Sequence, residues 1–240
     1  MFGEVLKNIR SFWIRLIRTD AFTLAAIIVT IIAAWCFLEI ADEVTEGETQ
    51  PVDEWVVHSL RHANDPSNPI GPPWLEEAFR DLTALGGITV LVLIIGTVAG
   101  YLWIYQAYRS IWLVLSASLG GLLLSTLLKG MFRRPRPDLT PYLTQVANSS
   151  FPSGHTMNSA VVYLTLGLLL AQLSDRRRLK VYFITVATLL TVLVGMSRVY
   201  LGTHYPSDIL AGWTAGVAWA GICWLVARRL RRTRTIEAIE

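Results

Sequence analysis

Long apolar stretches without charge, separated by short polar connectors, organise this chain from end to end. Six of them contain no Asp, Glu, Lys or Arg, and each is 17 to 20 residues long. Their ranges are 21–38, 86–105, 110–128, 157–173, 181–197 and 209–227. In a helix, about 20 apolar residues cross the roughly 30 Å hydrocarbon core of a bilayer. The pattern predicts an all-α, polytopic membrane protein, a bundle of six transmembrane helices.

The six stretches take up nearly half of the 240 residues, so the sequence predicts a single membrane domain over 1–240. The composition agrees, because 53% of the residues are hydrophobic and only 16% are charged, against about 25% in a typical soluble domain. Outside the spans, we expect an amphipathic segment at 1–20, a long loop at 41–85 and a basic tail at 228–240. Cys36 and Cys223 fall inside spans and are expected to act as small packing residues.

The charges in the connectors orient this bundle. Lys and Arg gather in 1–20, 176–180 and 228–240, whereas 42–81 holds ten carboxylates against Arg61 and Arg80. An excess of Lys and Arg marks the cytoplasmic connectors of membrane proteins. We therefore expect both termini in the cytoplasm and the 41–85 loop outside. The compactness of the chain favours a bacterial plasma (inner) membrane, with the outer face in the periplasm or at the cell surface.

The 41–85 loop is predicted to carry short helices. Apolar residues recur at helical spacing within 74–82, after Pro72 and Pro73, and a weaker repeat covers 52–60. Such helices suit either a lateral entrance for a lipid or a cap on the bundle, and the sequence leaves both open. His58 and His62 are four residues apart, yet neither the glutamate of a zinc motif nor a third ligand accompanies them. We expect both to be surface residues.

One connector on the predicted outer side is basic where Lys and Arg should be scarce. It contains Lys129, Arg133, Arg134 and Arg136. For Lys129 and Arg136 we favour an anionic ligand, since an arginine fork matches two phosphate oxygens and lysine acts as a point charge. Pro135 and Pro137 restrict the chain on both sides of Arg136. For Arg133 and Arg134, contact with lipid headgroups is the favoured interpretation.

A second candidate segment precedes the sixth span. His204 and Asp208 are four residues apart, and Pro206 between them favours the first turn of a helix. At this spacing the Asp208 carboxylate can reach the imidazole of His204. A carboxylate on one ring nitrogen fixes the tautomer and makes the other nitrogen a better nucleophile or base. Arg198 lies shortly before this pair and adds a third cation.

The third candidate segment, Pro152-Ser153-Gly154-His155, stands just before the fourth span. Ser153 is a favourable N-cap, and Gly154 lets the backbone approach a ligand closely. Exposed N–H groups at such a helix start bind anions without any charged side chain. His155 at this rim is positioned to protonate a departing oxygen. Because the connectors alternate between sides, all three segments are predicted to emerge on the same outer face.

Together the segments read Lys-x6-Arg-Pro, Pro-Ser-Gly-His and Ser-Arg-x5-His-x3-Asp, in this order. This pattern resembles the type 2 phosphatidic acid phosphatase superfamily, which also includes the vanadium haloperoxidases. The motifs and their near neighbours cover only about forty residues of the chain, and the six-span layout resembles the membrane lipid phosphatase branch.

The resemblance implies a role for each motif residue. Lys129, Arg136 and Arg198 would grip the phosphoryl oxygens, with Ser153 and the Gly154 amide completing the phosphate site. His204 would attack phosphorus to give a phosphohistidine, Asp208 would orient it, and His155 would protonate the leaving oxygen. No cofactor or metal is expected, because the three cations do what magnesium does elsewhere.

The predicted function is therefore metal-independent dephosphorylation of a lipid mono- or diphosphate at the outer membrane face. Undecaprenyl diphosphate and glycerolipid phosphates are favoured by family analogy alone. Two alternatives stay open, a lipid phosphotransferase and a non-catalytic transporter or scaffold. A lipid phosphate is the expected partner, no nucleic-acid partner is predicted, and the oligomeric state is unreadable from the sequence.

Overall fold

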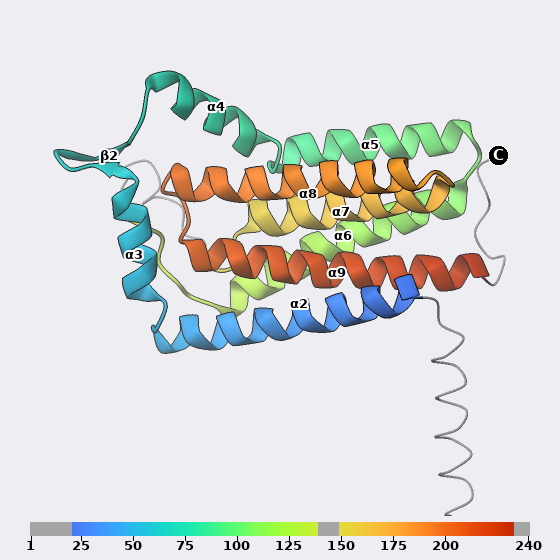
Figure 1. Cartoon of the computed structure of the whole chain (residues 1–240), viewed down its shortest axis with the longest axis horizontal. Coiled ribbons are helices and arrows are strands. Elements are labelled where there is room, and N and C mark those ends of the chain that lie inside the picture. The colour runs from blue at the N-terminus through green and yellow to red at the C-terminus, as the bar shows by residue number, and fades with distance from the viewer. Residues whose placement is uncertain (1–20, 139–148, 233–240) are drawn as a thin grey trace, which may run out of the picture.

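The computed structural model describes residues 21–138 and 149–232, which form eight helices and one small hairpin (Figure 1). The helices are α2 (Ala21–Glu46), α3 (Gln50–Ser59), α4 (Pro73–Ala84), α5 (Ile88–Ile104), α6 (Tyr108–Met131), α7 (Gly154–Leu173), α8 (Arg177–Tyr200) and α9 (Pro206–Arg232). The strands are β1 (Arg61–His62) and β2 (Asp65–Pro69). The predicted amphipathic segment 1–20 and the tail beyond residue 232 lie outside the described residues.

Long helices stand where the apolar stretches predict them. Five helices, α2, α6, α7, α8 and α9, are each long and apolar enough to cross a membrane. α5 has 17 residues and rises about 26 Å, slightly less than the hydrocarbon core. Together with α4, to which it is joined at a 50° bend, it passes the same test as a sixth span. The all-α, polytopic fold class is thereby confirmed.

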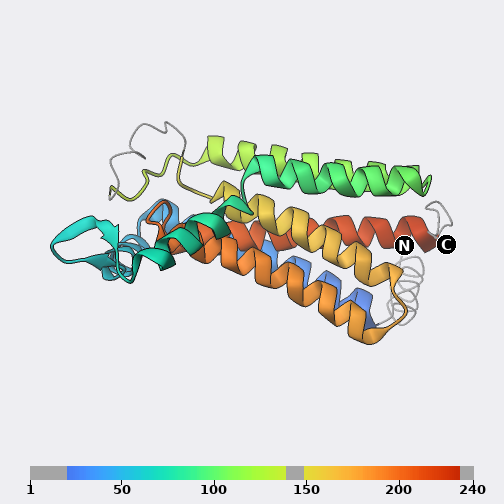
Figure 2. The ribbon, with the colours of Figure 1, turned by 90° about the horizontal axis from the view of Figure 1, so that it is seen from above.

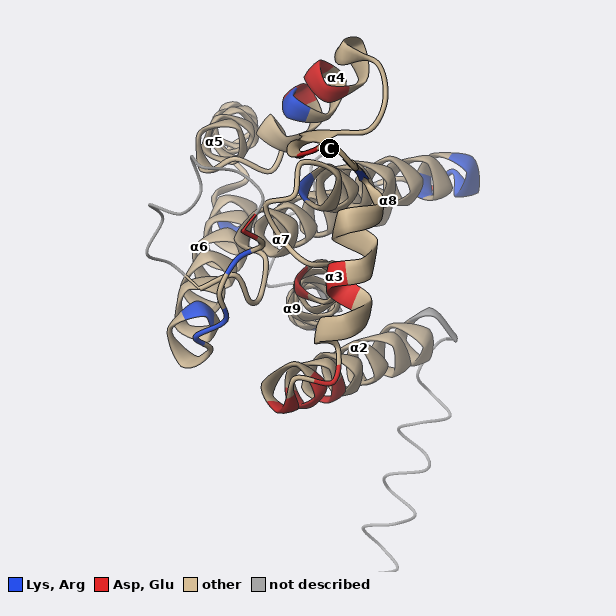
Figure 3. Cartoon of the chain, turned by 90° about the vertical axis from the view of Figure 1, so that its left-hand side faces the viewer, with Lys and Arg blue, Asp and Glu red and all other residues tan. Residues whose placement is uncertain are grey.

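α7 forms the centre of the bundle, with α6, α8 and α9 packed around it (Figure 3). α2 lies along α9, and α5 lies beside α6 (Figures 1 and 2). Glycines allow this close packing. A Cβ on Gly216 of α9 would stand 2.4 Å from the Cβ of Ala160, and one on Gly121 of α6 would stand 2.5 Å from Val161 Cγ1. Small residues at such positions let membrane helices approach each other closely.

The 41–85 loop folds against one end of the bundle, named here the loop end. α3, the hairpin and α4 lie there, together with the end of α2 and the start of α9, while α2 begins and α9 ends at the opposite end (Figure 1). α2 continues eight residues past the predicted span, until Gly47 with a φ of 82° follows its last turn. Both predicted short helices, α3 and α4, are present.

The hairpin β1–β2 was not predicted from the sequence. Its strands pair Arg61 with Pro69 and His62 with Asp65, and they lack the alternating apolar pattern that signals a strand. A buried Arg61 side chain ties the hairpin to the bundle, because its Nη2 donates to the Tyr200 carbonyl at 2.8 Å. His58 and His62 are exposed, as expected of surface residues.

Candidate active site

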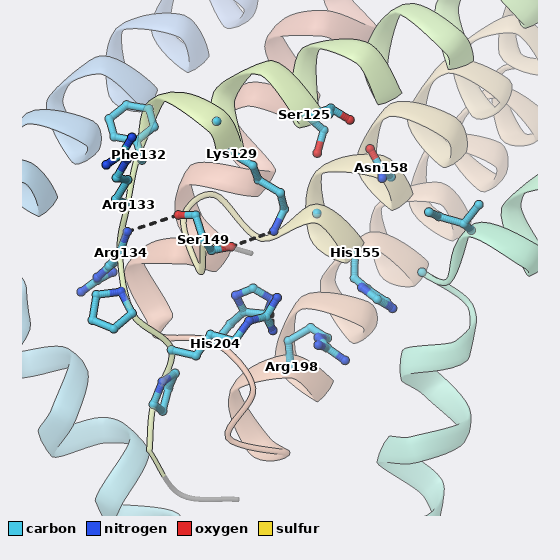
Figure 4. Close-up of a pocket in the computed structure, with 18 of the residues that line it drawn as sticks. Ser125, Lys129, Phe132, Arg133, Arg134, Ser149, His155, Asn158, Arg198 and His204 are labelled. Atoms are coloured by element: carbon cyan, nitrogen blue, oxygen red, sulfur yellow. Dashed lines mark hydrogen bonds between the residues drawn. The ribbon is translucent and has the colours of Figure 1, made fainter. Parts of the chain in front are cut away.

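A cavity of about 1140 Å³ opens at the loop end, and all three candidate segments reach it (Figure 4). The motif residues that line it are Lys129, Arg136, Gly154, His155, Arg198 and His204. They come from the end of α6 and the chain after it, the start of α7, the end of α8 and the turn before α9. The predicted convergence of distant motifs at one end of the bundle is therefore observed.

The turn between α8 and α9 places Arg198 and His204 beside the same cavity. α8 ends in a Schellman motif, in which the N–H of Thr203 donates to the Arg198 carbonyl and that of Gly202 to the Val199 carbonyl. Gly202 has a φ of 67°, a conformation that glycine adopts without the steric cost other residues bear. The reversal is tight, so the last turn of α8 and the residue His204 face one site.

Asp208 is held in place at the start of α9. It is the third residue of the helix, and its Oδ2 accepts the Tyr205 N–H at 2.9 Å, as the acidic member of a capping box does. The Ser150 hydroxyl also donates to Oδ2. The same oxygen lies 3.3 Å from His204 Nδ1, so the predicted pair is present.

This contact fixes the chemistry of the His204 ring. With Nδ1–H directed at the carboxylate, Nε2 carries the lone pair, and Arg136 Nη1 lies 3.4 Å from it. The side chain is 1% exposed. The nitrogen that points at the cavity is thus an unprotonated imidazole nitrogen beside a guanidinium, a suitable position for attack on a bound phosphoryl group.

Burial controls the protonation of His204. Loss of hydration lowers the pKa of its imidazole to about 4, although the bond to Asp208 favours the charged form; Arg198 and Arg136 lower the pKa further. The ring therefore stays neutral through the mildly acidic range. Because the unfolded chain binds this proton near pH 6.5, the stability that depends on neutral His204 is present above that value and declines as the pH falls toward 4.

We expect His204 to titrate near pH 4, well below an exposed histidine. The sequence has four histidines, so nitrogen chemical shifts of histidine-labelled protein in detergent can follow each ring, with His204→Ala assigning the signal. His58 and His62 are both exposed, and variants at these positions help to assign the remaining signals. A His204 signal that titrates near the ordinary histidine value of about 6.5 would contradict a buried, neutral ring.

Lys129 and Gly154 lie in contact across the cavity wall. Lys129 Nζ donates to the Ser149 carbonyl at 3.1 Å, and a Cβ on Gly154 would stand 2.9 Å from Lys129 Cε. Glycine at this position therefore makes room for the lysine stem, in addition to exposing the backbone at the start of α7. His155, the next residue, projects into the cavity (Figure 4).

Ser153 differs from its expected role. It occupies the N-cap position of α7 but makes no side-chain capping bond. Its hydroxyl is fully buried and accepts a bond from the Thr156 hydroxyl at 3.0 Å, while its N–H donates to the Asp208 carbonyl at 3.0 Å. Its place is thus behind the cavity wall, where it joins the start of α7 to the start of α9. The predicted contact of its side chain with phosphate stays a prediction.

Two of the guanidinium groups that line the cavity have buried donors without a partner among the described residues. Arg198 Nη1 donates to Thr83 Oγ1 of α4 at 3.1 Å, and Arg136 Nη1 lies 3.3 Å from the Thr203 carbonyl. The Nε atoms of both arginines are buried and unbonded. Buried N–H groups nearly always have partners, so these donors, beside a cavity rich in cations, fit a bound anion.

Arg134 corrects the sequence-based interpretation. Contact with lipid headgroups was favoured for it, but its side chain is 8% exposed and forms ion pairs with Asp208 and Asp53. Arg133 beside it is exposed at the cavity rim. No local pattern distinguishes the two adjacent arginines, because the carboxylates that pair with Arg134 lie 81 and 74 positions away. Asp53 and Ser150, which also support the site, were missed for the same reason.

Comparison with known proteins agrees with this geometry. A family model described as the PAP2 superfamily matches residues 110–232, half of the chain, including all three motifs. This chain belongs to the PAP2 superfamily. Phosphatidylglycerophosphatase B of Bacillus subtilis is 37% identical over 152 residues, which cover 62% of this chain and 73% of that protein. Lipid A 1-phosphatase of Rhizobium etli is 37% identical over 103 residues, 39% of this chain and 40% of that protein.

The fold agrees with a solved PAP2 structure as well. A transmembrane PAP2-type phosphatidylglycerolphosphate phosphatase from Bacillus subtilis matches with a TM-score of 0.76 and 29% identity, over 85% of this chain and 98% of that one. The resemblance inferred from the motifs is thus confirmed, and so is the prediction of a membrane-embedded enzyme of the phosphatase class.

Proposed function

We propose that this PAP2 protein removes phosphate from a lipid mono- or diphosphate, without a metal, through a phosphohistidine on His204. One observation carries the proposal. The free Nε2 of a neutral, carboxylate-bound imidazole faces a cavity whose other polar groups include Lys129, Arg136 and Arg198. A phosphoryl group bound by these cations would present its phosphorus to that nitrogen.

The reaction follows in two balanced steps. Nε2 of His204 forms a bond to phosphorus while the bond to the lipid oxygen breaks, and His155 gives that oxygen its proton. His155 then takes a proton from water, whose oxygen attacks phosphorus and breaks the P–N bond, releasing phosphate and neutral His204. Lys129, Arg136 and Arg198 stabilise the charge on the equatorial oxygens in both steps, the kind of preorganised electrostatics that dominates phosphoryl transfer.

The cavity also suits a substrate whose tail remains in the bilayer. Ile88 at the start of α5 and Leu122 of α6 line it, and both are exposed apolar side chains of helices expected to lie in the membrane. Gly86, at the bend between α4 and α5, borders the same space. These positions favour lateral entry beside α5, while α3 serves as a cap on the start of α9.

Relatives support a lipid phosphate as the substrate class. The similar proteins include a phosphatidylglycerophosphatase, two lipid A 1-phosphatases and a decaprenylphosphoryl-5-phosphoribose phosphatase of Mycobacterium tuberculosis, the last 28% identical over 114 residues. Glycerolipid phosphates and polyprenyl phosphates, undecaprenyl diphosphate among them, are therefore the candidates for this chain. The charge pattern of its connectors supports a site on the periplasmic or extracellular side, with both termini in the cytoplasm.

Phosphate release from a lipid panel tests the proposal. Purified protein in detergent is given phosphatidylglycerophosphate, phosphatidic acid, lipid A and undecaprenyl diphosphate, each in excess EDTA and in added magnesium. We expect release from at least one lipid, at the same rate in both conditions. Turnover that is lost in EDTA and restored by magnesium would contradict the metal-independent scheme, and release from none of the lipids would contradict the proposed substrate class.

A further inference from the structure

Arg134 lies at the centre of a buried ion cluster behind the cavity. Its Nη1 donates to Asp208 Oδ1 at 2.9 Å and to the Ser207 hydroxyl at 2.6 Å. Its Nη2 donates to Asp53 Oδ2 at 2.7 Å and to Gln50 Oε1 at 3.0 Å. Its guanidinium carbon also stands 4.5 Å from the centre of the Tyr205 ring. A planar fork that reaches two carboxylates at once is a geometry lysine cannot reproduce.

Asp53 joins this cluster from α3, in the 41–85 loop. One of its oxygens accepts the Ser207 N–H at 3.0 Å, and the other accepts both the Ser207 hydroxyl and Arg134. The carboxylate is 3% exposed and stands at the N-terminus of α9, where a negative charge is favourable. α3 is thereby attached to the same helix start that carries Asp208.

We propose that Arg134 and Asp53 are positioning residues that hold Asp208 ionised and aimed at His204, which makes α3 a part of the catalytic apparatus. The proposal rests on the proposed function only in assigning the reacting nitrogen to His204. The four groups alternate in the order Asp53, Arg134, Asp208, His204, each in contact with the next. Arg134 occupies Oδ1 of Asp208, which leaves Oδ2 for the imidazole.

Because positive and negative groups alternate in this series, removing the Arg134 charge and removing the Asp53 charge should shift the pKa of His204 in opposite directions. Without the Arg134 charge, Asp208 attracts the His204 proton more strongly, so the pKa of His204 rises. Without the Asp53 charge, the positive charge of Arg134 is no longer balanced, so the pKa of His204 falls. The titratable or charged groups that face His204 from the surrounding elements stay the same in both variants: Lys129, Arg136, His155, Arg198 and Asp208.

The test compares Arg134→Gln and Asp53→Asn with two controls, Arg80→Gln and Glu54→Gln. Arg80 is an exposed arginine of α4 that does not line the cavity, and Glu54 is the exposed neighbour of Asp53 on α3. For Arg134→Gln we expect kcat on a lipid phosphate to fall about 10- to 100-fold, as when a partner that orients a reacting histidine is lost, with little change in KM because the cations of the cavity remain. For Asp53→Asn we expect a smaller fall in kcat.

Histidine titration by NMR measures the pKa of His204 in each variant. If Arg134 and Asp53 only stabilised the fold, their replacement would not shift this pKa in opposite directions. The His204 signal is expected to titrate at higher pH in Arg134→Gln and at lower pH in Asp53→Asn, and to keep its wild-type position in both controls. Arg134→Lys keeps the positive charge but loses the two-pronged guanidinium. Compared with Arg134→Gln, it should bring the pKa of His204 closer to the wild-type value than it brings kcat. Thermal unfolding in detergent identifies any variant that fails to fold. If Arg134→Gln does not fold, Arg134→Lys takes its place in the comparison with wild type.

Unchanged His204 titration in folded Arg134→Gln and Asp53→Asn, or shifts in the same direction, would overturn the proposal. So would a loss of kcat no larger than that of the controls. Failure of the proposed function has a different signature, because wild-type protein would then release no phosphate while the opposite shifts of the His204 signal would still be seen.

Discussion

Replacing His204 with alanine is expected to abolish phosphate release, with a loss in kcat of about 10⁴-fold or more, as when a nucleophile is removed from a catalytic triad. The imidazole is the group whose Nε2 faces the cavity, and its other nitrogen is fixed by Asp208. No other side chain among those that line the described part of the cavity combines a free nitrogen lone pair with a carboxylate partner. Binding should survive, because Lys129, Arg136 and Arg198 are untouched.

The measurement is kcat and KM on the best lipid phosphate, together with equilibrium binding of inorganic phosphate. Phosphate can be held by the three cations without a bond to the imidazole, so its binding reports on the cation cluster. The matched control is His58→Ala on α3, since His58 is exposed. If His204→Ala protein is folded, binds phosphate and still turns over within tenfold of wild type, His204 is not the nucleophile.

Replacing His155 with asparagine is expected to lower kcat on a lipid phosphate by about 10²- to 10⁴-fold, the usual contribution of a general acid or base. His155 lines the cavity at the start of α7, across from His204. It is proposed to act twice, giving a proton to the lipid oxygen and then taking one from water. The size of the defect should therefore depend on the leaving group.

p-Nitrophenyl phosphate separates the two steps, because its leaving oxygen departs without needing a proton. With this substrate, His155→Asn should release a burst of one nitrophenolate per protein and then slow sharply, since water is no longer activated. His62→Asn, at an exposed position of the hairpin, serves as the control. Equal defects on both substrates, without a burst, would count against the double role of His155.

The spans and the motif geometry could be predicted because local sequence determines them. Uncharged stretches of sufficient length have few alternatives to a membrane helix. Pro206 and Asp208 are residue types that favour the first turn of a helix, and they mark the start of α9. The four-residue spacing between His204 and Asp208 brings the carboxylate within reach of the imidazole. Successive connectors lie at opposite ends of such a bundle, so the order of the spans predicts that the three motifs lie at one end.

The parts that escaped prediction depend on partners far along the chain. Arg133 and Arg134 look alike in the sequence, and only the approach of α3 and α9 buries one of them. Ser153 has the residue type of an N-cap, yet the buried Thr156 hydroxyl and the Asp208 carbonyl use its polar groups. The β1–β2 hairpin has no strand pattern and is joined to the bundle through Arg61. Tertiary contacts override local preference at each of these sites.

The most direct test is to locate the phosphoryl group itself. His155→Asn protein is mixed with p-nitrophenyl phosphate, quenched in alkali, where phosphohistidine is stable, and digested for mass spectrometry. The account predicts one phosphate per protein on the peptide that contains His204, and none in a His204→Ala/His155→Asn double variant. Phosphate on a different residue, or a burst of nitrophenolate with no phosphorylated peptide, would contradict it.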